Sequence, residues 1–321
     1  MITTLHLPSQ DADLARTLQP ADPLAARSCA PAMRRPGQFH DLPRNSVLLR
    51  RLRSNRVQRY YLFVPASYAP GREIVVLVHG ISRNAREHAI AFAPFAARSG
   101  VALLAPLFTK EFCRDYQRLG LTGTGHRADA LLQDIVAEAT SDIGAIGGSF
   151  SLFGHSGGAQ FAHRYAFAWP QHVRRLAVCA AGNYTFPDPS LPFPFGLDCS
   201  GLRDHFRFEL HATLRIPTLV VVGSRDRQRD QTLRSDSGLD ELQGRHRFER
   251  GRRWTRAMIA AAAAHGIASH IEFVRIPGAG HRFTDTVRRG LCEAVWPWLT
   301  ANLEHTSPAA CHISPHDETI P

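Results

Sequence analysis

The segment Gly154-His155-Ser156-Gly157-Gly158 has residue types and a spacing that could support nucleophilic chemistry. It follows an apolar run and precedes a helical pattern that continues to about Trp169, which is the strand–turn–helix setting of a G-x-S-x-G nucleophile. Glycines on both sides of Ser156 remove Cβ atoms that would crowd a sharp turn. Free N–H groups at the start of the following helix suit an anion. The pattern predicts that Ser156 is a nucleophile.

A serine hydroxyl needs a neighbouring base, and that base needs a third group to fix its tautomer. The segment ending in Asp226 directly follows the apolar run 218–222, and the Gly-x-Gly loop that carries His281 follows the run 271–276. Because the carboxyl ends of parallel strands meet at one edge of a sheet, we expect Ser156, Asp226 and His281 to converge there. Asp230 remains an alternative to Asp226, and either aspartate could instead cap a helix.

The anion formed by attack on a carbonyl needs about two N–H donors. We expect the N–H of Gly157 to supply one and the N–H of Ile81, in the loop after His79-Gly80, to supply the other. His79 is predicted to be a structural turn residue, and His155 to face the pocket or the core without acting as a second base. A substrate pocket is predicted from side chains of these loops and of two aromatic segments, namely Ser82, Phe108, Tyr116, His155, Tyr184 and Phe186.

Apolar runs alternate with amphipathic segments along most of the chain, which predicts an α/β protein with a mainly parallel central sheet flanked by helices. Strands are expected before Ser156 and at 57–65, 74–78, 101–105 (stopped by Pro106), 174–180, 218–222 and 271–276. Helices are expected at 84–98, 127–141, 157–169, 252–265 and 283–303.

The domain organisation follows from where this alternation begins, pauses and ends. Residues 1–45 are rich in Pro, Ala and Arg and are expected to form a flexible arm, and 305–321 a flexible tail. Residues 46–304 are expected to form one domain. Within it, the proline- and phenylalanine-rich segment 183–214 interrupts the alternation, so we expect a lid-like insertion there.

The net charge of +10 comes almost entirely from arginine, since Lys110 is the only lysine. The arginines are scattered, so most are expected on a solvated surface and no nucleic-acid partner is expected. The longest uncharged window, about 143–162, is broken by glycines and serines and does not predict a membrane span. Six cysteines without CxxC spacing predict neither a zinc site nor a disulfide framework. No secretory signal is recognisable at the N-terminus, so a cytoplasmic location is expected.

Four motif blocks carry a family resemblance: Val76-Leu77-Val78-His79-Gly80, Gly154 to Gly158, Gly223 to Asp226 and Gly278 to His281. They resemble those of the α/β-hydrolase superfamily, over roughly residues 55–303. The segment Tyr61-Leu62-Phe63-Val64-Pro65 is in addition similar to polyhydroxybutyrate depolymerases and feruloyl esterase-like members.

The resemblance and the motifs together lead to an expected function. It is hydrolysis of a small-molecule carboxylic ester by a Ser-His-Asp triad through an acyl-enzyme, with no metal or organic cofactor. Peptidase, thioesterase or acyltransferase activity on the same triad is the alternative within this chemistry. A ligand-binding or sensor protein without turnover is the alternative outside it.

Overall fold

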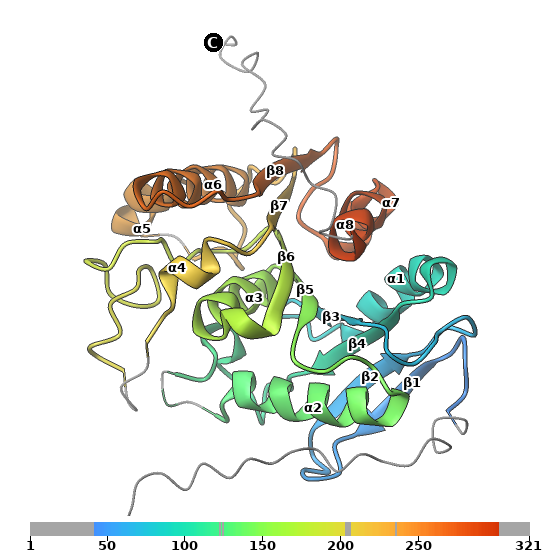
Figure 1. The fold of residues 1–321 in the computed structure, drawn as a ribbon. Helices are drawn as coiled ribbons and strands as arrows, with labels where there is room; N and C mark the ends of the chain where they lie inside the picture. Colours follow the sequence, from blue (N-terminus) through green and yellow to red (C-terminus); the bar gives the residue numbers. More distant parts are fainter. Residues whose placement is uncertain (1–41, 122, 124, 203–206, 235, 302–321) are drawn as a thin grey trace, which may run out of the picture. The chain divides into compact units, whose positions relative to one another are not determined.

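The computed structural model describes residues 42–121, 123, 125–202, 207–234 and 236–301, and its central element is one eight-stranded sheet (Figure 1). The strand order is β1-β2-β4-β3-β5-β6-β7-β8. Strand β2 runs antiparallel to its neighbours β1 and β4, and every other neighbouring pair is parallel. The strands are β1 (Val47–Arg51), β2 (Arg59–Phe63), β3 (Ile74–Val78), β4 (Ala102–Leu107), β5 (Phe150–His155), β6 (Val173–Cys179), β7 (Thr218–Gly223) and β8 (Ile271–Ile276).

Helices cover both faces of the sheet (Figure 1). On one face α1 packs on β2, β3 and β4 and against α8, which contacts β5 and β6. On the other, α2 packs on β4, α3 on β5 and β6, and α6 on β7 and β8. The helices are α1 (Ala85–Ser99), α2 (Ala128–Ile143), α3 (Gly157–Ala168), α4 (Leu210–Thr213), α5 (Ser237–Gln243), α6 (Arg247–Ala264), α7 (Phe283–Arg288) and α8 (Leu291–Thr300), with 3₁₀ turns η1 (Tyr116–Arg118) and η2 (Pro170–His172).

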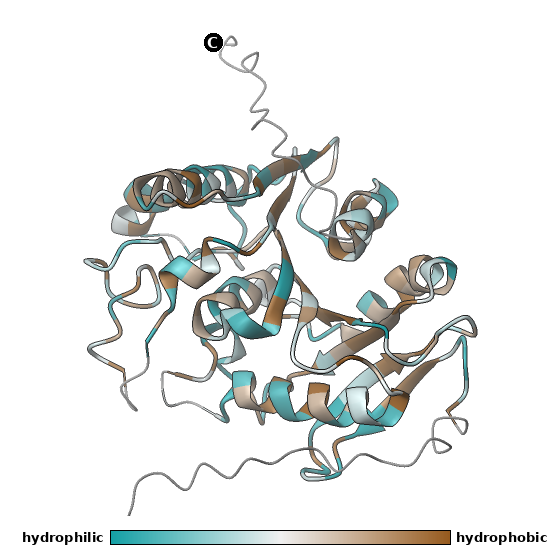
Figure 2. Ribbon diagram, in the orientation of Figure 1, coloured by the Kyte–Doolittle hydropathy of each residue, from teal (hydrophilic) through white to brown (hydrophobic). Residues whose placement is uncertain are grey.

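The central strands are apolar because both of their faces are covered. Every residue of β3, β5 and β7 is buried, as expected for the interior of a parallel sheet. Figure 2 shows these hydrophobic strands against helices in which hydrophobic and hydrophilic residues alternate. The edge strand β8 buries its end residues and exposes others between them. The apolar runs of the sequence therefore lie where the hydrophobic core is.

The strand order reverses beside β3. From β3 the chain passes through α1 to β4 on one side, and from β4 through α2 to β5 on the other side of β3. In open α/β sheets such a reversal opens a crevice at the carboxyl ends of the two strands. Here the loop with Ile81 follows β3 and Ser156 follows β5, so the reversal brings the predicted anion-binding groups together.

Most of the predicted strands and helices are present in the structure, and the differences are local. Strands β3 and β8 have the predicted bounds, whereas β1 and the short α5 were not predicted. Pro106 does not stop β4: it pairs with Tyr60 of β2, and the strand ends one residue later. The predicted helix 283–303 is divided into α7 and α8 at Gly290, whose φ of 97° is incompatible with helix.

Most of the described arginines are exposed or half-buried, as expected, but a few are not. The side chains of four arginines in α3, β6 and α6 are fully buried: Arg164, Arg175, Arg247 and Arg250. Arg164 reaches the carbonyl oxygens of Gln117 and Pro194 and the side chains of Asn183 and Thr185. Burial lowers its pKa to about 9.

Three sequence predictions concern segments that are partly or wholly outside the described residues. The arm 1–45 and the tail 305–321 lie outside them except for residues 42–45. In the predicted insertion 183–214, the described residues before α4 form no helix or strand, only an isolated bridge between Pro192 and Asp198. In the described chain, no helix has the length and apolar character needed to cross a membrane.

Candidate active site

Ser156 occupies a strained turn between β5 and α3, with φ 54° and ψ −113°. A positive φ is rare for a residue with a Cβ and marks stored strain. Its N–H donates to the carbonyl oxygen of Cys179 on β6 (2.8 Å). Only glycine fits on either side, because a Cβ at Gly154 would lie 2.1 Å from the carbonyl oxygen of Gly158, and one at Gly158 would lie 2.1 Å from that of Val78. The tight turn therefore holds Ser156 above the carboxyl end of β5.

Ser156, His281 and Asp226 form a continuous hydrogen-bonded chain. The Ser156 Oγ lies 3.0 Å from Nε2 of His281, and Nδ1 of His281 lies 2.8 Å from Oδ2 of Asp226. Because an aspartate oxygen only accepts, Nδ1 carries a proton and Nε2 is left to accept the hydroxyl proton of Ser156. Asp226 is buried, and the His281 side chain is 20% exposed. The arrangement can therefore move a proton from a serine hydroxyl to a neutral imidazole.

The loops that carry the aspartate and the histidine are tied to each other. The N–H of Arg225 donates to Ala279 O (2.8 Å), and the N–H of Gly278 donates to Ser224 Oγ (2.8 Å). Gly223 permits this approach, since a Cβ there would lie 2.4 Å from Ala279 O. The glycine at the end of β7 thus allows the loop after β8 to bring His281 onto Asp226.

The two aspartates that the sequence left as alternatives have separate partners. Asp226 contacts His281, whereas Asp230 accepts two hydrogen bonds from Arg247, at 2.8 and 3.0 Å. The Arg247 guanidinium also lies 3.4 Å from Oδ1 of Asp226. Hydrogen bonds from Arg247 hold the pKa of Asp230 well below its usual range. Asp226 therefore lies between an imidazole and a buried arginine, and Asp230 is a counter-ion of that arginine.

The loop after β3 lies against the start of α3. A Cβ on Gly157 would lie 3.0 Å from Cγ2 of Ile81, and one on Gly80 would lie 3.4 Å from Cβ of Ser156. Among the described residues, no acceptor is recorded for the N–H of Ile81 or of Gly157. Two unengaged N–H groups beside a serine are suited to a developing oxyanion.

His79 and His155 are both buried and both engaged with backbone groups. His79 Nδ1 lies 2.8 Å from Gly80 O, and its Nε2 accepts from the N–H of Phe108 (3.0 Å). Nε2 of His155 lies 3.1 Å from the carbonyl oxygen of His281. Burial lowers the pKa of His79 to about 4 and that of His155 well below its usual range. Each imidazole is therefore neutral near pH 7 and supports a loop of the site.

The structure brings only some of the predicted pocket residues to the surface. Ser82 is exposed and the Ile81 side chain is 45% exposed. By contrast Phe108, Tyr116 and Tyr184 are fully buried, because they pack into the core beneath the loops. Phe186 is 9% exposed. Phe108, Tyr116 and Tyr184 thus pack inward in this structure, and their role in a substrate pocket stays a prediction.

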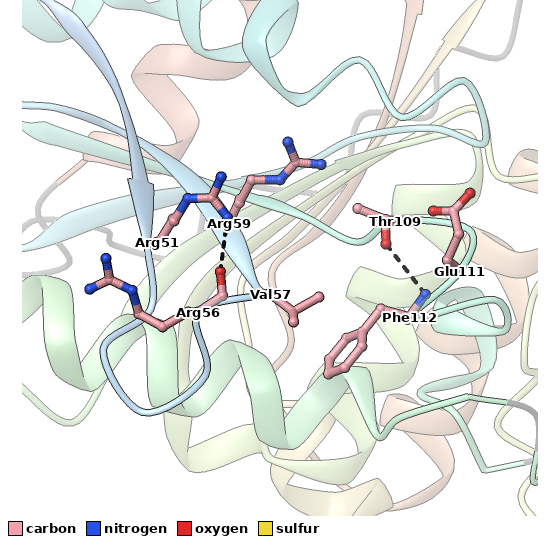
Figure 3. Close-up of a pocket in the computed structure, with 7 residues that line it drawn as sticks. All are labelled: Arg51, Arg56, Val57, Arg59, Thr109, Glu111 and Phe112. Atoms are coloured by element: carbon pink, nitrogen blue, oxygen red, sulfur yellow. Dashed lines mark hydrogen bonds between the residues drawn. The ribbon is translucent and has the colours of Figure 1, made fainter.

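A separate groove of about 510 Å³ lies where the turn between β1 and β2 meets the segment after β4 (Figure 3). None of the predicted site residues lines it. Its walls combine three arginines with an apolar floor and one carboxylate: Arg51, Arg56, Arg59, Val57, Phe112, Thr109 and Glu111. Thr109 and Phe112 belong to the same segment as Tyr116, so the groove adjoins the loop that supports the site.

Two arginines near Ser156 were not singled out from the sequence. Arg247 contacts Asp226, and Arg83 lies over the ring of Tyr116, 4.6 Å from its centroid. Both belong to a chain rich in scattered arginines, so residue type alone gave no signal. The one available clue was position, because Arg83 lies two residues after Ile81 in the predicted oxyanion loop.

No metal-binding group is assembled in the part of the chain that the structure describes, where no cluster of three or more His, Cys, Asp or Glu side chains occurs. The described cysteines, Cys113, Cys179, Cys199 and Cys292, are unpaired. As predicted, Cys179 is a buried residue of a core strand.

Comparisons with known proteins identify the fold that carries this site. No protein-family model matches the sequence, and no curated protein sequence matches it. Among solved structures, the chain is similar to LpqC, a poly(3-hydroxybutyrate) depolymerase from Bordetella parapertussis, with 28% identity, a TM-score of 0.64, and coverage of 74% of this chain and 83% of that one.

Two more distant structures have the same architecture. Poly(aspartic acid) hydrolase-1 from Sphingomonas sp. KT-1 is 22% identical, with a TM-score of 0.62 over 74% of this chain and 93% of that one. A thermostable esterase is 12% identical, with a TM-score of 0.51 over 79% of this chain and 62% of that one. With its mainly parallel eight-stranded sheet, its flanking helices and these neighbours, the chain has the α/β-hydrolase fold, and its likeness to LpqC supports a hydrolase of that type.

Proposed function

We propose that the protein is a serine hydrolase of carboxylic esters in which Ser156 is the nucleophile, His281 the general base and acid, and Asp226 the group that orients His281. The observation that carries this proposal is the pair of contacts made by one imidazole, 3.0 Å from Ser156 Oγ on one side and 2.8 Å from Asp226 Oδ2 on the other. The likeness to LpqC supports it from a second direction.

The first half of the reaction forms an acyl-enzyme. His281 Nε2 accepts the hydroxyl proton as Ser156 Oγ attacks the ester carbonyl carbon, and the resulting oxyanion accepts hydrogen bonds from the N–H groups of Gly157 and Ile81. Asp226 stabilises the imidazolium that forms. The imidazolium then returns its proton to the departing alkoxide, the carbon–oxygen bond breaks and the alcohol leaves.

The second half restores the enzyme. A water molecule gives its proton to His281 Nε2 and attacks the acyl carbon, and the same two N–H groups hold the second oxyanion. When this intermediate collapses, the proton passes from His281 to Ser156 Oγ and the carboxylic acid is released. Buried Arg247 lies beside Asp226 throughout and holds its carboxylate in place.

The test compares the wild type with Ser156→Ala, using a fluorophosphonate probe and short-chain p-nitrophenyl esters. We expect covalent labelling and ester turnover in the wild type and neither in the variant. Ser141→Ala serves as a matched control, because Ser141 is an exposed serine of α2 outside the proposed site. Labelling that persists in Ser156→Ala, or a folded wild type that is neither labelled nor active, would overturn the proposal.

The bond that is cleaved requires a second comparison. Esters, thioesters and aminoacyl anilides with one common acyl group would be compared by kcat/KM, and an added alcohol would report acyl transfer. We expect the ester to have the highest kcat/KM and water to be the main acceptor. A higher kcat/KM for the thioester or the anilide would make that compound the preferred substrate class. The proposed roles of Ser156, His281 and Asp226 would be unchanged.

A further inference from the structure

Arg83 lies in the loop that carries Ile81. A turn closes this loop, with the N–H of Arg83 donating to Gly80 O (3.1 Å). The Arg83 backbone has a φ of 59°, a value that is unusual for an arginine. The side chain turns toward the interior, where its guanidinium carbon lies 4.6 Å from the centre of the Tyr116 ring. The loop conformation therefore places a cation over one particular aromatic ring.

Tyr116 connects this cation to the predicted oxyanion site. Its hydroxyl donates to His79 O (3.0 Å) and lies 2.6 Å from the position that a Cβ on Gly157 would take. The ring over which Arg83 lies therefore has its hydroxyl end beside Gly157. Tyr116 thus lies between the Arg83 guanidinium and the point at which an ester carbonyl would bind.

The guanidinium has unused hydrogen-bonding capacity. Its Nη1 is shielded from solvent and has no hydrogen-bond partner, and Arg83 makes no ion pair within the described part of the chain. By contrast, the fully buried Arg164 and Arg250 donate hydrogen bonds from all three of their guanidinium nitrogens. A buried donor without a partner is costly. A carboxylate that enters the site would satisfy it with a strong, charge-assisted hydrogen bond.

We propose that Arg83 binds a carboxylate of the substrate, so that the preferred substrates are esters carrying a free carboxylate a few bonds from the ester group. The inference rests on the proposed function, because it assigns a substrate class to the same site. The arginine-lined groove beside the segment after β4 adds positive charge on the same side and favours approach of an anion.

The test uses pairs of esters that differ only in a carboxylate. Monoethyl adipate is paired with ethyl hexanoate, and 5-acetoxypentanoate with pentyl acetate, so that the carboxylate lies on the acyl side in one pair and on the alcohol side in the other. We expect the wild type to favour the anionic member of at least one pair by about tenfold or more in kcat/KM, as a charge-assisted hydrogen bond allows. Arg83→Gln should lose this preference while keeping its activity on the neutral member.

Two control variants distinguish the effect of the Arg83 charge from effects of misfolding and of the protein's net charge. Arg83→Lys should keep part of the preference, and Arg256→Gln, which removes an exposed arginine of α6 outside the groove, should keep nearly all of it. An equal rate of labelling by a neutral fluorophosphonate would show that Arg83→Gln is folded. A wild type without preference in either pair, or an Arg83→Gln protein that retains the preference, would overturn the inference.

Binding measured without turnover separates this inference from the proposed function. Adipate binding to Ser156→Ala protein would be measured by calorimetry, with and without Arg83→Gln. We expect the second substitution to weaken binding by about tenfold or more. Absence of adipate binding to Ser156→Ala, or equal binding by both proteins, would overturn the role of Arg83. Failure of the wild type to hydrolyse any ester would instead overturn the proposed function and leave the calorimetric result to decide the role of Arg83.

Discussion

Arg247 lies 3.4 Å from the carboxylate oxygen of Asp226 that does not face His281. Both side chains are almost completely buried, with exposed fractions of 1% and 2%. The aspartate therefore has an opposite charge on each side when His281 is protonated. The hydrogen-bonded chain of Ser156, His281 and Asp226 therefore continues as a line of contacts to an arginine of α6.

Replacing Arg247 by Met tests this line. The change leaves the buried Asp226 with one partner fewer, and loss of one member of a buried pair costs on the order of 3–5 kcal/mol of the free energy of unfolding. We expect a lower denaturation midpoint. In the folded fraction we expect kcat/KM to fall by about tenfold to a hundredfold, because His281 would be oriented less well, and each factor of ten corresponds to about 1.4 kcal/mol of activation free energy. Arg253→Met, in the same helix with a half-exposed side chain, is the control. Equal stability of the two variants would contradict the prediction.

The two aspartates predict different losses of activity. Asp226→Asn should reduce kcat on the order of 10³–10⁴-fold, because an asparagine at this position allows the wrong imidazole tautomer. Asp230→Asn should reduce it by less than about tenfold, because Arg247 keeps its contact with Asp226. Steady-state kinetics of both variants on one ester measure the difference. A larger loss in Asp230→Asn would exchange the roles of the two residues.

The stability contributed by Asp230 should depend on pH. Hydrogen bonds from Arg247 depress the pKa of Asp230 in the folded protein, so its contribution is complete above the pKa of the unfolded chain, about 3.9, and is lost as the pH falls through the lower folded value. The melting temperatures of the wild type and Asp230→Asn should therefore differ at pH 7 and converge as the pH falls below about 4. The carboxylate is 43% exposed, so the difference should be small and should shrink in high salt. A difference that is constant with pH would refute the assignment.

The glycines of the turn around Ser156 predict a steep effect on folding. Gly154→Ala would place a Cβ 2.1 Å from a backbone oxygen, and a backbone clash cannot be relieved by a side-chain rotation. We expect a loss of more than about 3 kcal/mol in the free energy of unfolding, beyond the usual range for overpacking. Gly147→Ala is the matched control, since nothing lies within 4 Å of the new Cβ and φ is not positive there. Chemical denaturation of both variants gives the comparison.

The parts that could be predicted from the sequence are those that depend on local pattern. Five-residue apolar runs such as Ile74–Val78 identify strands, and a glycine-flanked serine or histidine after such a run identifies a strand-end loop. Strand β1 was not predicted because the alternation of apolar and polar residues is interrupted there by consecutive arginines at 50 and 51. Nor does the sequence reveal which of Asp226 and Asp230 faces His281, because that depends on the position of Arg247, in a helix reached only after another helix.

The inward packing of Phe108 and Tyr184 could not be predicted for a related reason. An aromatic residue in an irregular segment has no periodicity that separates a core position from a pocket wall. Arg83 illustrates the same limit. Its guanidinium is placed by a left-handed backbone and by a ring from the segment after β4, and neither is encoded near it in the sequence.

The positive φ of Ser156 lowers the stability of the fold at the position of the proposed nucleophile. An L-residue held in that conformation costs on the order of 1–3 kcal/mol, and glycine adopts it freely. A Ser156→Gly protein is therefore expected to melt at a higher temperature than the wild type, while Ser156→Ala, which keeps the Cβ, is not. Selection for stability alone would favour glycine at this position, so a serine there is what selection for the proposed chemistry would produce.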